Sequence, residues 1–102
     1  MSLLTEAVSQ EQQRIKRMMD RYQSELLSLP KGSLIIKKIK GNSYYYLQYR
    51  DGKKTVSKYI GKDDDRVREL QEQIKRRKHV QAMLRALQEE YILAQKMMEV
   101  HL

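Results

Sequence analysis

A chain of 102 residues without Cys, Trp or Phe can bury one modest core, built from Leu, Ile, Val, Met and Tyr. The lack of cysteine excludes a disulfide framework and favours the cytoplasm. No apolar run approaches the roughly 18 residues that a membrane span needs. We therefore expect a single cytoplasmic domain over residues 1–102, with no membrane partner.

The net charge of +8 is confined to the middle of the chain. Residues 31–62 contain nine Lys and Arg and the single acid Asp51, whereas the basic and acidic residues on either side balance in number. A local excess of positive charge favours an acidic partner, of which nucleic acid is the most common kind.

Apolar residues at spacings of three, four and seven predict an amphipathic helix over residues 5–28. Thr5 or Ser9 can cap its start. Pro30 disfavours helix at Leu29, and Gly32 allows a turn, so we expect this helix to end before them.

Residues 33–60 predict three antiparallel strands. The pairs Gly41-Asn42 and Asp51-Gly52 are signals for two-residue hairpin turns. Side chains of one face are then mainly apolar and expected on the core, unless a one-residue bulge exchanges the two faces. That apolar face comprises Leu34, Ile36, Tyr45, Leu47, Tyr49 and Val56.

Residues 64–100 predict a long helix, either continuous or broken near Lys78, where the apolar positions change phase. Such a helix is longer than a three-stranded sheet can cover. Its distal half must therefore pack on the first helix, on a second copy in a homodimer, or on both. The fold class is α+β, in the order α-β-β-β-α.

The sequence offers no catalytic constellation. Asp63-Asp64-Asp65 could bind Mg²⁺, but acidic residues where a helix begins are more typical of a helix cap. His79 and His101 are isolated and lack the spacing of a metal-ligand pair. We expect a protein that is not an enzyme and needs no metal or cofactor.

The second sheet face combines Tyr with Lys, Arg and small polar residues, a composition that suits phosphates and base edges. A rival interpretation is that the tyrosines merely fill strands that lack Phe and Trp. The basic run that begins at Lys75 either extends this face or is a solvated helix face that pairs with Glu72. The candidate nucleic-acid-binding residues are Lys37, Tyr44, Tyr46, Gln48, Arg50, Lys53, Thr55, Ser57, Lys75 and Arg76.

Three motifs lie in a characteristic order: Leu29-Pro30-Lys31-Gly32-Ser33, then residues 41–50 (GNSYYYLQYR), then residues 57–62 (SKYIGK). Over residues 29–80 the chain resembles short uncharacterised bacterial proteins, common in Gram-positive bacteria and their mobile elements. This resemblance implies a family but no activity.

The hairpin resembles, more loosely, the arm-binding domain of tyrosine recombinases, an AP2-like fold whose sheet lies in the DNA major groove. This similarity implies, by analogy, that the sheet of this chain binds DNA. From the charge excess on residues 31–62 and the composition of the second sheet face, we expect a DNA-binding accessory or regulatory protein of a mobile element. The extra first helix, the longer last helix and the missing catalytic domain depart from that pattern. The matching residues are Gly41, Tyr44, Tyr46, Tyr49, Arg50, Asp51, Gly52 and Lys53.

We expect a nucleic-acid partner, with double-stranded DNA favoured over RNA. The alternative is a protein-interaction module, such as a mobile-element-encoded inhibitor of a host protein. In that case the helices, with Met83, Met97 and Met98, would dock on the partner, and the basic sheet would meet an acidic protein surface.

Overall fold

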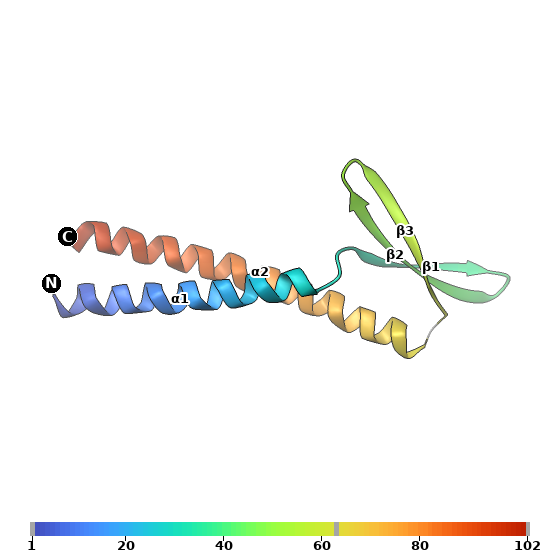
Figure 1. Ribbon diagram of the computed structural model, residues 1–102, viewed down its shortest axis with the longest axis horizontal. Helices are drawn as coiled ribbons and strands as arrows, with labels where there is room; N and C mark the ends of the chain where they lie inside the picture. The colour runs from blue at the N-terminus through green and yellow to red at the C-terminus, as the bar shows by residue number, and fades with distance from the viewer. Residues whose placement is uncertain (1, 63, 102) are drawn as a thin grey trace. The chain divides into compact units, whose positions relative to one another are not determined.

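The computed structural model describes residues 2–62 and 64–101 (Figure 1). Its elements confirm the expected α-β-β-β-α order and the α+β class. They are helix α1 (Leu3–Ser28), strands β1 (Ser33–Ile39), β2 (Asn42–Asp51) and β3 (Lys54–Gly61), and helix α2 (Asp65–His101). Contacts within the chain cluster into two compact units. The helical unit contains α1 and α2 from His79 onward, and the sheet unit spans Leu29–Lys78.

Helix α1 begins two residues earlier than expected, because Ser2 caps it. The Ser2 Oγ accepts a hydrogen bond from the backbone N–H of Thr5 at 3.1 Å and lies 2.8 Å from the Thr5 hydroxyl. The expected cap at Thr5 or Ser9 is therefore wrong, since a serine three residues ahead of Thr5 supplies the acceptor first. The helix ends as expected at Ser28, two residues before Pro30.

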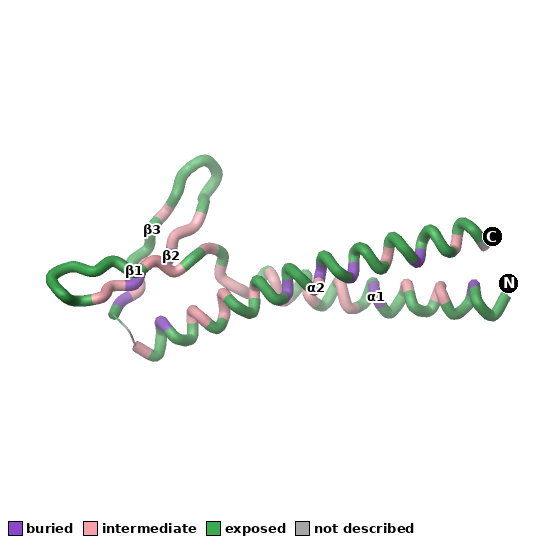
Figure 2. Tube along the Cα trace, turned by 180° about the vertical axis from the view of Figure 1, so that it is seen from behind, coloured by how far each residue is buried: buried purple, intermediate pink, exposed green. Residues whose placement is uncertain are grey.

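The helical unit pairs α1 with the C-terminal part of α2, side by side and antiparallel (Figures 1 and 2). Its buried apolar side chains are few, as the composition implied. Gln12 and Gln95, which are 83 positions apart, join the helices through a side-chain hydrogen bond of 2.8 Å. The buried apolar residues are Ile15, Val80, Leu84, Leu87 and Ala94.

Helix α2 is continuous over 37 residues, so the alternative of a break near Lys78 is wrong. The segment has neither Gly nor Pro and is rich in strong helix formers, so nothing interrupts its backbone hydrogen bonds. The change of apolar phase has another cause. Before His79 the helix buries Val67 within the sheet unit, and from His79 onward it buries Val80 within the helical unit.

The three strands form one antiparallel sheet in the order β1-β2-β3. Each hairpin is shifted by two residues from the expected register. The first turn is Lys40-Gly41, both with positive φ, and the second is Gly52-Lys53, with positive φ at Gly52. A glycine at these turn positions is typical of type I′ and type II′ turns respectively.

A shift of two residues leaves side chains on their predicted faces, except at the end of β3, where a register shift opposite Tyr45/Tyr46 pairs Tyr45 with Gly61 and interrupts the alternation. It also aligns apolar residues across the strands, because Leu34 pairs with Leu47 and Ile36 with Tyr45. Tyr45 and Leu47 are buried, so the face expected on the core is confirmed at its centre.

The sheet is three strands wide only at residues 45–48 of β2, because β1 pairs with residues 42–48 and β3 with residues 45–51. Two-stranded ribbons therefore extend from this centre, one ending at the turn Lys40-Gly41 and the other at Gly52-Lys53. The outer ends of both ribbons are exposed (Figure 2).

Candidate nucleic-acid interface

The net positive charge of the chain lies almost entirely in the sheet unit. Residues 29–78 contain fifteen Lys and Arg and six Asp and Glu, a net charge of +9. Residues 1–28 and 79–102 contain six basic and seven acidic residues, a net charge of −1. An acidic partner is therefore attracted to the sheet unit and not to the helical unit.

The face of the sheet opposite Tyr45 and Leu47, here called the open face, has a cluster of three tyrosines at one end. The rings of Tyr46 and Tyr59 meet edge to face with centroids 5.4 Å apart, and those of Tyr44 and Tyr59 are tilted with centroids 6.3 Å apart. Ile39 completes the lining of a shallow hollow of about 340 Å³ at this cluster. Such contacts orient the rings before any ligand arrives.

Two lysines lie over the tyrosine rings. The Lys37 ammonium is 4.5 Å from the centroid of the Tyr46 ring, and the Lys62 ammonium is 5.9 Å from that of Tyr44. Cation–π attraction holds an ammonium close to a ring without neutralising its charge. The aromatic end of the open face therefore combines hydroxyl groups with positive charge.

The other end of the open face is polar and lies on the ribbon formed by β2 and β3. Gln48 pairs with Ser57 and Arg50 with Thr55 across the two strands, so these four side chains are neighbours on one face. Arg50, Thr55 and Ser57 are exposed. This end offers donors and acceptors of the kinds that read base edges.

Most of the predicted binding residues are thus brought together, but three are not. Lys53 lies in the turn after β2 rather than on the open face, because the hairpin register is shifted by two residues. Lys75 and Arg76 are on α2. Lys75 forms an ion pair with Glu72 at 3.8 Å and lines a hollow with Leu34, whose side chain is on the opposite face of the sheet.

Two residues of the open face were not among those predicted to bind. Tyr59 is expected on this face from strand alternation, and its contacts with both other tyrosines place it in the same cluster. Lys62 follows the end of β3, beyond the register shift opposite Tyr45/Tyr46, so strand alternation did not predict its position over the Tyr44 ring.

Asp64, in the acidic run where α2 begins, caps this helix. The Asp64 carboxylate accepts hydrogen bonds from the backbone N–H groups of Arg66 at 3.0 Å and Val67 at 3.2 Å. Asp63 lies outside the described residues.

Within residues 2–62 and 64–101 there is no group of three His, Cys, Asp or Glu residues that could hold a metal ion. Nor does any helix in this part of the chain have an apolar stretch that could cross a membrane.

Fold and surface together define a small basic α+β protein with one open, tyrosine-containing sheet face. The chain belongs to the family of a domain of unknown function, DUF6788, whose model matches residues 6–69. This match runs from α1 through the sheet into the start of α2 and confirms an uncharacterised family. No curated protein and no solved structure matches the chain.

Proposed function

We propose that the protein binds double-stranded nucleic acid, preferably DNA, through the open face of its sheet unit, without catalysing a reaction. The observation that supports this proposal is the net charge of +9 on residues 29–78, beside −1 on the rest of the chain. Neutralising phosphates with Lys and Arg supplies most of the affinity of such complexes.

The polar ribbon of β2 and β3 would supply the contacts to bases. A two-stranded β-ribbon fits the major groove, where Arg pairs with guanine, Gln with adenine, and Ser or Thr with either. Arg50, Gln48, Thr55 and Ser57 present these groups on one face. In the AP2-like domains that the hairpin resembles, a sheet lies in the groove in the same manner, which supports this arrangement by analogy.

The tyrosine cluster favours a duplex over a single strand. Stacking of unpaired bases needs open ring faces. Here an ammonium lies over Tyr46 and another over Tyr44, and Tyr59 meets both other rings at an angle. The phenolic hydroxyls and the two lysines are instead suited to contacts with phosphates.

A pair of double variants tests this face. Lys37→Ala/Arg50→Ala removes two positive charges from the open face, and we expect duplex affinity to fall about 10- to 100-fold in roughly 100 mM salt. Lys38→Ala/Lys58→Ala removes two charges from the opposite face of the same sheet. This control should lose much less affinity, because only long-range attraction is weakened. Fluorescence anisotropy of a labelled duplex measures both.

Equal losses from the two pairs would mean that charge alone, and not the open face, determines binding. An unchanged affinity of Lys37→Ala/Arg50→Ala would show that the open face is not the interface. If the unaltered protein bound no nucleic acid at all, an acidic protein surface would become the better candidate for its partner. By the resemblance of residues 29–80 to short proteins of bacterial mobile elements, we propose that the protein serves such an element as an accessory or regulatory factor.

A further inference from the structure

The helical unit has an apolar groove between its two helices. The groove has a volume of about 340 Å³, and apolar side chains from both helices line it. Leu93 is 60% exposed, and Val100, two helical turns further along α2, is 77% exposed. The apolar residues of this groove are Ala7, Val8, Ile15, Leu93, Ala94 and Met97.

A second hollow between the same helices is polar. Ser9, Gln12, Gln13 and Lys16 line it together with Tyr91, and the hydrogen bond between Gln12 and Gln95 lies beside it. Water can solvate these groups at little cost. The apolar groove therefore marks one particular side of the helical pair as a surface to be covered.

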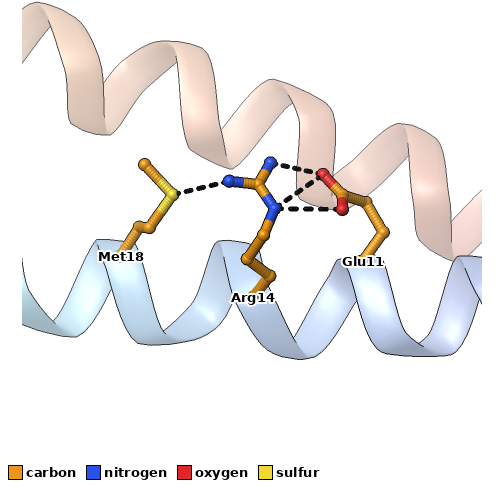
Figure 3. Close-up of polar contacts among 3 residues, drawn as sticks. All are labelled: Glu11, Arg14 and Met18. Carbon is orange, nitrogen blue, oxygen red and sulfur yellow. Dashed lines mark hydrogen bonds and ion pairs between the residues drawn. The ribbon is translucent and has the colours of Figure 1, made fainter.

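The rim of the apolar groove has both signs of charge. Glu11 and Glu90 line it, and Arg14 donates hydrogen bonds to the Glu11 carboxylate and one of 3.0 Å to the Met18 sulfur (Figure 3). The hydrogen bonds between Arg14 and Glu11 lower the pKa of the Glu11 carboxyl and raise the pKa of Arg14, to which the nearby charge of Glu90 also contributes, so Arg14 and Glu11 form a charged pair at neutral pH.

We propose that the apolar groove is covered by the same groove of a second copy of the chain, in a two-fold symmetric dimer of the helical units. A two-fold contact needs projecting and receding side chains within one patch, because each copy presents the same surface. The groove meets this requirement, since Leu93 and Met97 are large and partly exposed whereas Ala7 and Ala94 are small. Large side chains of one copy can then fill the space beside the alanines of the other, as knobs do in helical bundles.

The charge of the helical unit also favours a second copy of the chain as the occupant of the groove. A second helical unit has a net charge of only −1, so two of them repel each other little, and the rim of each copy has a basic group, Arg14, beside the acids Glu11 and Glu90. Nucleic acid is a poor occupant for an apolar groove whose unit is slightly acidic. A dimer would also join two sheet units, which raises affinity for a ligand that both can reach.

Light scattering coupled to size exclusion tests the dimer without nucleic acid, so its outcome is separate from that of the proposed function. For a chain of 12.2 kDa we expect twice this mass at about 100 µM protein. Leu93→Lys puts a charge into the groove and should give the monomer mass. The matched control Gln13→Lys adds the same charge at the polar hollow and should leave the dimer unchanged.

Far-UV circular dichroism of each variant checks that the helices remain folded, which is expected because Leu93 is exposed. A monomer mass for the unaltered protein at 100 µM would overturn the proposal. So would a dimer that persists in Leu93→Lys, or one that both variants dissociate equally.

Discussion

Replacing Gly32 with alanine should destabilise the sheet unit by about 2–5 kcal/mol, from backbone strain and overpacking together. Gly32 has a φ of 114°, which side chains with a Cβ rarely adopt. An added methyl group would also overlap the backbone carbonyl of Gln48 and reach within 3.0 Å of the Tyr49 Cβ. Backbone atoms of the central strand cannot move aside cheaply, so the segment that leads into β1 would have to shift.

Gly52→Ala is the matched control. Its φ of 63° is also positive, but no atom lies within 4 Å of the added Cβ, so only strain of about 1–2 kcal/mol is expected. Urea unfolding followed by the near-UV circular dichroism of tyrosine measures both, because five of the seven tyrosines lie in the sheet. Equal destabilisation by the two variants would contradict the close packing of Gly32 on β2.

Ile15→Ala should destabilise the helical unit by about 2–5 kcal/mol, the usual cost of removing a large buried side chain. Ile15 is only 2% exposed and is one of few buried apolar residues in this unit. A small core has little to compensate the loss of one member, so we expect a clear drop in the thermal midpoint. Circular dichroism at 222 nm, at one fixed protein concentration, follows the helices.

Leu27→Ala removes an aliphatic side chain from the same helix and serves as the control for Ile15→Ala. Leu27 is 91% exposed, so its loss should change stability by less than about 0.5 kcal/mol. If Leu27→Ala destabilised the protein as much as Ile15→Ala, the assignment of the buried side of α1 would be wrong.

The order of elements and the two faces of the sheet were predictable because they depend on short-range periodicity. Alternation between Tyr45, Leu47 and Tyr49 needs no long-range information, and a shift of two residues leaves it intact. The turn positions were not predictable from dipeptides alone, because glycine can occupy either central position of a hairpin turn. The pairing of Leu34 with Leu47 places Gly41 second in the first turn, and the pairing of Asp51 with Lys54 places Gly52 first in the second turn.

Helix α2 shows a different limit of periodicity. A change of apolar phase near Lys78 is compatible with a broken helix or with one helix whose buried side changes along its length. Apolar periodicity alone leaves both possibilities open. The high helix propensity of these residues favours the continuous helix. The phase change arises because α2 belongs to the sheet unit before His79 and to the helical unit from His79 onward.

The candidate site was predictable where its residues lie within strands. Tyr44, Tyr46, Gln48 and Arg50 alternate along β2, so their common face follows from the sequence. Side chains at strand ends were harder to place. The direction of Lys62 and the position of Lys53 both depend on where pairing stops, which is set by backbone geometry rather than by residue type.

The salt dependence of duplex binding tests the central claim most directly. Anisotropy of a labelled DNA duplex across a salt series gives the slope of log K against log salt, to which each neutralised phosphate contributes about −0.9. Four or more phosphate contacts predict a slope of about −3.6 or steeper, with weaker binding to single-stranded DNA and to duplex RNA. No binding at low salt, where a unit of charge +9 attracts DNA most strongly, would contradict a nucleic-acid function for this protein.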